Sequence, residues 1–229
     1  MPQILHCDNH VIAVVKPAGM PVVPDASGDE ALSDWTKAWI KKEYNKPGDV
    51  FLGVVHRLDR PVSGIVVFGR TSKGASRLSA AWRQGRVKKI YRGISDASPT
   101  LAVGDTGQVV QWLIKDRQRN VVRAVDAKTA ERHNSKANKQ DRAREARSNW
   151  KVLSIDQGKT LLELEPVTGR AHQLRLACLE LGLPLMGDLK YGAKSAMAGR
   201  RIGLHARQLI FPHPTRDEEI DLICKEPFE

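Results

Sequence analysis

The sequence contains little cysteine, no long apolar segment and a deficit of acidic residues. Three of its 229 residues are cysteines, and they are Cys7, Cys178 and Cys224. They have no metal-ligand spacing and cannot all pair, so the sequence excludes a disulfide-rich secreted domain and favours a reducing cytoplasm. Apolar runs such as Ile65–Phe68 are far shorter than the roughly 20 residues of a membrane-spanning helix. No basic segment followed by an apolar one begins the chain, so no secretory signal is expected.

Basic residues outnumber acidic ones. Lys and Arg total 37 while Asp and Glu total 26, which gives a formal charge of +11 and a pI of about 9.8. The chain is 41% hydrophobic and can therefore bury a core, which excludes general disorder. What remains is a soluble basic protein whose charge suits a polyanionic partner.

Hydrophobic patterning predicts one α+β domain over residues 1–229, because no repeat and no linker divides the chain. Strands are expected at Val11–Val15, Val50–Val55, Gly64–Phe68, Val87–Ile94, Trp150–Leu153 and Leu161–Glu165. Helices are expected at Ala31–Lys42 with Ser33 as its cap, at Ser72–Arg83, and from about Arg170 to Leu181, where Gly182 can cap the last turn.

Two segments concentrate the positive charge. Lys128–Arg147 carries seven basic and three acidic residues, which indicates a solvated insertion or a mobile arm over about residues 126–148. Arg70–Arg92 carries eight basic residues and no acidic one, and Lys73 and Arg77 share a helical face within it. That face is either simply solvated or contacts phosphates, and the charge of the whole chain favours phosphate contact.

Asp59 lies between two guanidinium groups in the run Arg57-Leu58-Asp59-Arg60. An ordinary surface ion pair would contribute only about 0–1 kcal/mol there. Arg175 borders the apolar stripe of its expected helix, so it is partly desolvated and requires an acidic partner. Composition alone does not identify Asp59 as that partner. The histidines have no metal-ligand spacing, so no metal site is expected.

Six short motifs, in order from Lys16 to Ala206, give the chain a family resemblance. His56-Arg57-Leu58-Asp59-Arg60-Pro61-Val62-Ser63-Gly64 resembles the H-R-L-D-x-x-[TS]-S-G signature of the RluA-type pseudouridine synthases, with Val62 where Thr is more usual. The other five are Lys16-Pro17-Ala18-Gly19, Lys89-Ile90-Tyr91, Gly169-Arg170-Ala171-His172-Gln173-Leu174-Arg175, Gly187-Asp188 with Tyr191-Gly192, and Leu204-His205-Ala206. The insertion matches no segment of the family pattern, and the small N-terminal RNA-binding domain frequent in the family is not seen.

The resemblance implies the pseudouridine synthase fold, with a mixed, mainly antiparallel central sheet flanked by helices and loops. It implies isomerisation of uridine within RNA, in which the base is detached from the sugar, turned and rejoined through carbon 5. Such a reaction needs no redox change or group donor, so no cofactor is expected. A cytoplasmic monomer acting on structured RNA is expected.

By the same resemblance, Asp59 is the catalytic aspartate and Arg175 pairs with it. Asp59 would add to the base, add to the sugar carbon or abstract a ribose proton, and the sequence does not choose among these routes. Tyr91 would contact the target base, unless it is only a core aromatic of its strand. Arg57 would fill the gap left by a flipped nucleotide. The remaining base- or RNA-contacting residues would be Leu174, Leu204, Arg60, Lys73, Arg77, Lys89 and His172.

Other functions remain as alternatives. A non-catalytic RNA-binding or ribosome-assembly factor with the same fold would bind RNA without isomerising it. A nucleobase deaminase would need a zinc-binding His/Cys-x-x-Cys arrangement, which the sequence lacks, and a glycosylase would leave an abasic site. The RNA would be transfer RNA, large-subunit ribosomal RNA or both, and a compact stem-loop is favoured.

Overall fold

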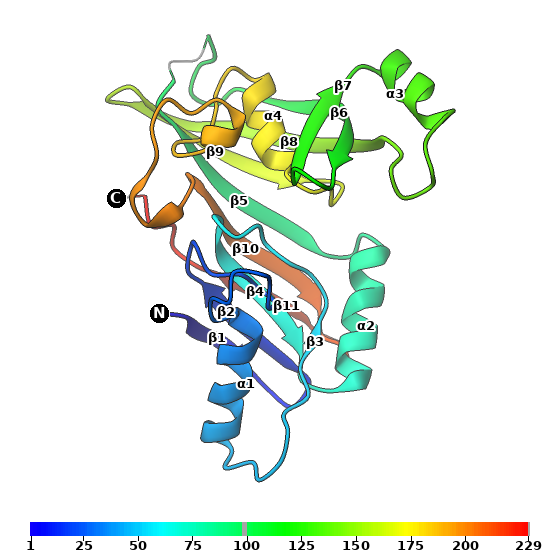
Figure 1. The fold of residues 1–229 in the computed structure, drawn as a ribbon. Coiled ribbons are helices and arrows are strands. Elements are labelled where there is room, and N and C mark those ends of the chain that lie inside the picture. The colour runs from blue at the N-terminus through cyan, green and yellow to red at the C-terminus, as the bar shows by residue number, and fades with distance from the viewer. Residues whose placement is uncertain (98–99, 229) are drawn as a thin grey trace.

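The computed structural model describes residues 1–97 and 100–228, and its strands form one mixed sheet (Figure 1). The strands are β1 (Gln3–Cys7), β2 (Val11–Lys16), β3 (Gly53–Val54), β4 (Ser63–Gly69), β5 (Lys88–Ser95), β6 (Thr106–Asp116), β7 (Val121–Val125), β8 (Arg144–Asp156), β9 (Lys159–Pro166), β10 (Leu204–Pro212) and β11 (Glu219–Ile223). The helices are α1 (Leu32–Glu43), α2 (Ser72–Arg83), α3 (Ala127–Asn134) and α4 (Gln173–Glu180), with short 3₁₀ turns η1 (Leu189–Tyr191) and η2 (Ala198–Arg200).

The sheet follows the order β1-β2-β4-β10-β5-β9-β8-β6-β7, with β3 paired to β4 and β11 paired to β10. Within the described residues, β4 and β10 pair in parallel and the other neighbours are antiparallel. The expected α+β class with a mixed, mainly antiparallel sheet is confirmed. No helix in the described part of the chain is long and apolar enough to cross a membrane.

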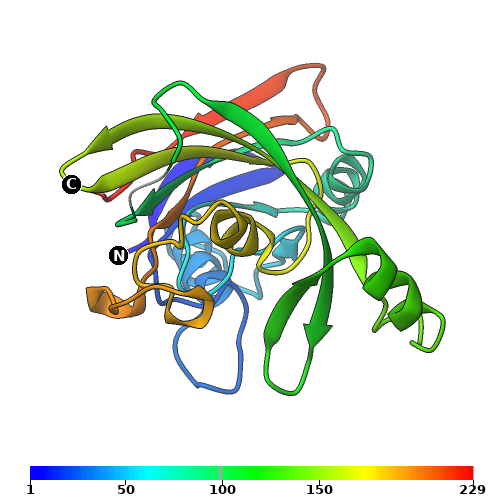
Figure 2. The ribbon, with the colours of Figure 1, turned by 90° about the horizontal axis from the view of Figure 1, so that it is seen from above.

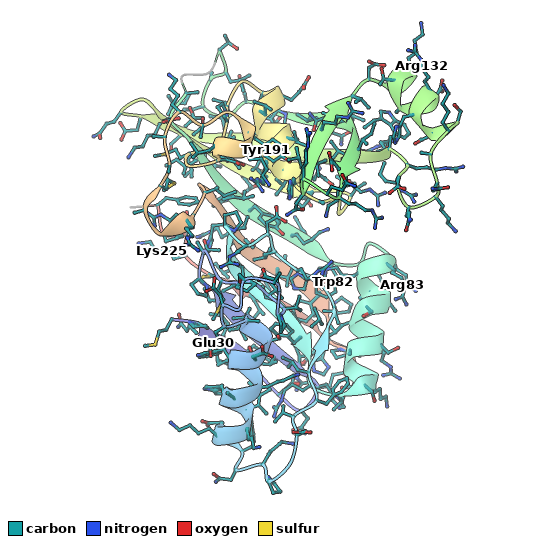
Figure 3. All side chains as sticks on the ribbon, viewed as in Figure 1. Glu30, Trp82, Arg83, Arg132, Tyr191 and Lys225 are labelled. Carbon is teal, nitrogen blue, oxygen red and sulfur yellow. The ribbon has the colours of Figure 1, made fainter. Side chains whose placement is uncertain are left out.

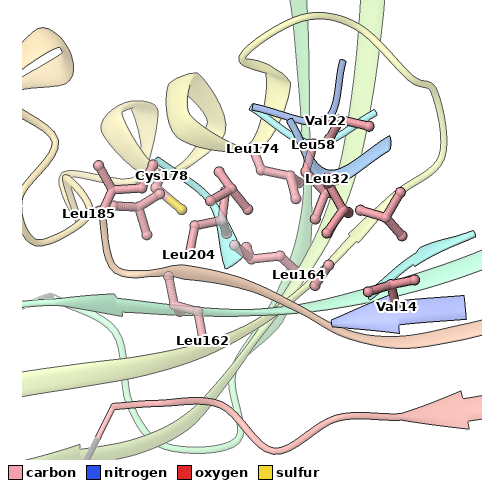
Figure 4. Packing of buried hydrophobic residues seen from close by; sticks show 14 of the residues in the cluster. Val14, Val22, Leu32, Leu58, Leu162, Leu164, Leu174, Cys178, Leu185 and Leu204 are labelled. Carbon is pink, nitrogen blue, oxygen red and sulfur yellow. The ribbon is translucent and has the colours of Figure 1, made fainter. Parts of the chain in front are cut away.

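Both faces of the central strands are covered by helices, which explains the unbroken apolar run of β4. Val66 packs in one cluster with Leu32 of α1 and Leu174 of α4 (Figure 4). Val67 packs in the opposite cluster with Leu78 of α2. A strand that alternates between two buried faces needs apolar residues at every position, so its sequence does not alternate.

Helix ends depart from the predictions at two places. Ser33 lies inside α1 and does not cap it; the first amide groups of the helix donate instead to the carbonyls of Pro21 and Val22, which removes the need for a side-chain cap. α4 begins at Gln173 rather than near Arg170, because His172 has a left-handed backbone with φ of 55°. In contrast, α2 has the bounds that its pattern predicts.

The strand expected at Val50–Val55 is reduced to the two residues of β3, which pair with Gly69 and Phe68 at one end of β4. The polar insertion is partly regular: it contains α3 and the first residues of β8, with turns between them. Asp126 caps α3 by accepting the amide hydrogen of Thr129, and Ala130 packs on Ile114 of β6. Of the two alternatives for this segment, the structure favours the solvated insertion. Figure 2 shows α3 at the periphery, beyond the central strands.

Candidate active site

A cleft of about 780 Å³ is lined by Asp59. This volume is within the range of small-molecule sites and admits one nucleoside. The residues of the cleft come from the loop before β4, from β5, from the end of β9 and from α4, together with the β6–β7 turn. Trp82, at the end of α2 (Figure 3), also lines the cleft and stacks on His56 with ring centroids 4.7 Å apart.

Buried contacts fix the backbone that carries Asp59. The ammonium group of Lys16, at the end of β2, is fully buried and donates to the carbonyls of Pro17, Met20 and Arg60 at 2.8–3.0 Å. Burial lowers the pKa of Lys16 to about 7, although the nearby Asp59 opposes this shift. Lys16 therefore connects the end of β2 to the loop that carries Asp59 and Arg60.

Gly64 allows β4 and β10 to approach each other just after that loop. Its φ is +119°, and a Cβ at this position would overlap the backbone of Ala206, its parallel partner. The neighbouring pair is Ser63 with His205, whose side chains lie 2.8 Å apart. The glycine of the H-R-L-D motif is thus required by backbone geometry.

Arg175 contacts Asp59, as expected, but its main partner is another carboxylate. Its Nη1 lies 3.4 Å from Asp59 Oδ2, whereas Nε and Nη2 each donate to Asp188 at 2.6 Å. The bidentate partner of Arg175 is therefore Asp188, and the expected pair of Arg175 with Asp59 is present as a single, longer contact. Asp188 and Arg175 are 1% and 6% exposed, so the pair is sheltered from water. One edge of the guanidinium is held rigidly, and the remaining nitrogen is left for Asp59.

His172 approaches the same oxygen of Asp59. Its Nε2 lies 3.8 Å from Oδ2, and its Nδ1 lies 2.6 Å from the hydroxyl of Tyr191. Burial lowers the pKa of His172, an effect that Asp59 opposes. The sequence marked His172 as a residue that contacts the base or the RNA; the structure places it beside the carboxylate of Asp59 in the same cleft.

Tyr91, Leu174 and Leu204 line one side of the cleft. Tyr91 lies on β5 between Leu164 of β9 and Ala206 of β10. Burial raises its pKa, and the negative charge of Asp59 adds to this effect. Leu174 and Leu204 are buried in the main core (Figure 4), and they give the cleft an apolar wall beside Asp59, which we call the recess.

Basic side chains surround the recess. Arg57 and Lys89 line the cleft, and so do Lys115, Arg170 and Lys190. These last three residues were not predicted as contacts. Lys115 lies near the end of β6, opposite Val122 of β7, and lines the cleft from the β6–β7 hairpin. Its local sequence does not reveal where that hairpin lies.

Three other predicted contacts have different surroundings. Arg60 lines the cleft, but its guanidinium donates to the carbonyl of Gly19 and pairs with Asp25 and Asp29. Lys73 and Arg77 are exposed on α2, outside the set of residues that line the cleft.

The arrangement suits chemistry on an uncharged, planar base. The carboxylate of Asp59 lines the cleft, Arg175 and His172 approach a single oxygen of it, and apolar and aromatic side chains line the cleft as well. In the described residues, no three His, Cys, Asp or Glu side chains are grouped so that they could hold a metal ion.

Comparison with known proteins agrees with this geometry. A family model described as RNA pseudouridylate synthase matches residues 10–180. The dual-specificity RNA pseudouridine synthase RluA of Yersinia pestis is 30% identical, over 98% of this chain and 99% of its own length. The ribosomal large subunit pseudouridine synthase C of Rickettsia conorii is 29% identical, over 98% of this chain and 68% of its own. The solved structure of human RNA pseudouridylate synthase domain containing 4 aligns with a TM-score of 0.74 and 26% identity, covering 98% of this chain and 88% of that one. The expected pseudouridine synthase fold is thus confirmed, and the chain belongs to the RNA pseudouridylate synthase family, in its RluA-type branch of isomerases.

Proposed function

We propose that the protein isomerises uridine to pseudouridine in structured RNA and that Asp59 is the catalytic carboxylate. The observation that carries the proposal is the position of Asp59. Its carboxylate lies in the cleft, next to the apolar recess, and Arg175 and His172 approach one of its two oxygens. The other oxygen is left for the substrate.

The reaction breaks the bond between N1 of uracil and C1′ of ribose and forms a bond from C5 to C1′. C5 loses its proton and N1 gains one, so the atoms balance without a co-reactant. A carboxylate can begin this exchange as a nucleophile or as a base, and the guanidinium of Arg175 pairs with one of its oxygens. Tyr91 would hold the turning uracil against the walls formed by Leu174 and Leu204.

The target nucleotide would leave its stack to enter the cleft. A base that is paired or stacked is not accessible to a carboxylate in a recess, so enzymes that act on bases flip them out. Arg57 is exposed at the mouth of the cleft and is suited to occupy the vacated position, because a guanidinium stacks on bases.

A basic surface next to the cleft would dock the flanking RNA. Residues 115–147 contain 11 Lys or Arg and five Asp or Glu, so this segment alone carries a charge of 11 − 5 = +6 out of the total of +11. The segment begins at Lys115 inside the cleft and extends to α3, where Arg132 projects outward (Figure 3). Its charge and position fit phosphates beyond the target base.

For the substrate, we propose transfer RNA, large-subunit ribosomal RNA or both. Relatives named for dual specificity and for the ribosomal large subunit support this choice. We further propose that the protein acts in the cytoplasm as a monomer and a single domain. Position-resolved pseudouridine mapping of total RNA from cells with and without the gene would identify the uridine.

The test of catalysis is Asp59→Asn, assayed by tritium release from RNA labelled at carbon 5 of uridine. We expect release to be lost while the dissociation constant for RNA changes little. Asp49→Asn, at an exposed position in the loop before β3, is the matched control. Release by Asp59→Asn would refute the role of Asp59. RNA binding by the wild type without release from any cellular RNA would instead favour the non-catalytic factor.

A further inference from the structure

Tyr191 lies at the centre of a hydrogen-bonded chain that ends at Asp59. Its hydroxyl oxygen accepts the backbone N–H of Val122, in β7, at 2.9 Å. The same hydroxyl lies 2.6 Å from Nδ1 of His172. Tyr191 is 5% exposed, so its hydroxyl proton has to find a partner within the protein.

These contacts determine which nitrogen of His172 carries the proton. With the oxygen already accepting from Val122, the hydroxyl satisfies its own proton by donating it to Nδ1, which must then be unprotonated. Burial lowers the pKa of His172 and keeps the ring neutral. A neutral ring without a proton on Nδ1 carries it on Nε2.

The protonated Nε2 faces the carboxylate of Asp59. Its distance from Oδ2 is 3.8 Å, so a shift of less than about 1 Å converts the approach into a hydrogen bond. Arg175 approaches the same oxygen at 3.4 Å, and its guanidinium lies 4.7 Å from the ring centre of Tyr191. Tyr191 therefore touches both groups that converge on Asp59.

We propose that Tyr191 and His172 are positioning residues for the isomerisation: the Tyr191 hydroxyl fixes His172 as the Nε2–H tautomer, and that N–H orients Asp59 through Oδ2. The proposal rests on the proposed role of Asp59. Neither residue needs to touch the uracil in this arrangement. Val122 belongs to the β6–β7 hairpin. The chain of hydrogen bonds therefore also connects the carboxylate of Asp59 to a part of the cleft that would contact RNA.

The hairpin is held at a second point close by. Lys190, next to Tyr191, donates to the carbonyl of Asn120 at 3.0 Å, and both residues line the cleft. Leu113 of β6, Val122 of β7 and Leu176 of α4 pack with Tyr191 in one hydrophobic cluster. A displacement of the hairpin would therefore act on the hydroxyl of Tyr191, and through it on His172.

The first test is Tyr191→Phe, which keeps the ring beneath Arg175 and removes only the hydroxyl. We expect kcat to fall about 10- to 100-fold, the effect of slightly misplacing a reacting group, with KM for RNA nearly unchanged. Tyr44→Phe is the matched control, because the Tyr44 hydroxyl contacts Cys7 and Arg70 outside the cleft. Nitrogen-15 NMR of the histidines should show the Nε2–H tautomer for His172 in the wild type and a mixed population in Tyr191→Phe.

A second pair of variants separates positioning from folding. The left-handed backbone of His172 suits Asn better than Gln, so a purely structural role predicts that His172→Asn is the more active variant. The amide nitrogen of Gln, however, extends to the depth of Nε2, whereas that of Asn stops near Nδ1. We therefore expect His172→Gln to retain the higher kcat, although it should be the less stable of the two.

Any of three results overturns the proposal: His172 of the wild type carries its proton on Nδ1, Tyr191→Phe keeps the wild-type kcat, or His172→Asn has a kcat as high as that of His172→Gln. These outcomes are distinct from failure of the proposed function. If Asp59→Asn is inactive and Tyr191→Phe is fully active, only the positioning chain is refuted. If Asp59→Asn is active, the role of Asp59 is refuted, and the positioning role falls with it.

Discussion

Asp188→Ala should destabilise the protein strongly, because it leaves the guanidinium of Arg175 buried without its bidentate partner. Both side chains are almost inaccessible, and the two hydrogen bonds between them are 2.6 Å long. Removing one member of such a pair typically costs about 3–5 kcal/mol, most of it from the charge left uncompensated. Arg175 keeps its contacts with Asp59 and with the ring of Tyr191, so we expect a loss near the lower end, about 3 kcal/mol.

Urea unfolding at 25 °C measures this loss directly. For a chain of this length, about 3 kcal/mol corresponds to a decrease in Tm of roughly 6–12 °C. The double variant Arg175→Met with Asp188→Leu removes both charges together and should recover most of the stability, since an apolar pair of similar volume replaces a buried ion pair at little cost. This double variant should be inactive even though it is stable, because Asp59 then lacks the guanidinium of Arg175.

Two results would refute this reasoning. A loss below about 1 kcal/mol in Asp188→Ala would mean that water or Asp59 compensates the freed guanidinium. A double variant as unstable as the single one would mean that the cost comes from packing rather than from an unpaired charge.

The other predictions concern the loop anchor, the strand contact and the RNA surface. Because burial lowers the pKa of Lys16 to about 7 from 10.5, the unfolded chain binds more protons at this residue between those pH values. Its contribution to the free energy of unfolding should therefore rise with pH across that window, and the difference between wild type and Lys16→Met, measured by urea unfolding at several pH values, should follow it. Gly64→Ala should cost about 1–3 kcal/mol by the same measurement, because alanine would strain a backbone with φ of +119°; an unchanged midpoint would contradict this. Lys115→Gln with Arg132→Gln should reduce the slope of log Kd for RNA against log salt by about 2, whereas Lys41→Gln on α1 should have no effect. Equal slopes in the wild type, the double variant and Lys41→Gln would mean that the basic surface around Lys115 and Arg132 is solvated and does not contact RNA.

The sequence was most informative where one local signal sufficed. For α2, the cap residue Thr71 and the apolar spacing lie within one segment, and the predicted bounds agree with the structure. The apolar run of β4 was likewise recognisable, because a strand buried on both faces is apolar at every position. The helix within the insertion was not predicted, because α3 buries little more than Ala130 and its other residues form no apolar pattern of helical spacing.

The family resemblance pointed to residues that share one cleft, but not to the contacts between them. It named Asp59, Tyr91 and Arg175, which all line the cleft, yet the pairing of Arg175 with Asp188 is set by the turn after α4. A buried guanidinium requires a carboxylate, but several lay within reach in the sequence, and only the fold selects among them. The role of Tyr191 depends on a backbone amide of β7, which lies 69 residues earlier and which no side-chain pattern indicates.

The cations of the chain fall into two groups that salt should separate. Lys16 and Arg175 are buried and bonded to carbonyls or carboxylates, where ions from solution screen them little. Lys115 is exposed in the cleft and Arg132 is exposed on α3, and RNA bound at either residue would release counterions. Raising the salt concentration should therefore raise KM for RNA by a much larger factor than it lowers kcat. A parallel fall in kcat at saturating RNA would mean that the ion pair of Arg175 with Asp188 is open to solvent, contrary to its burial.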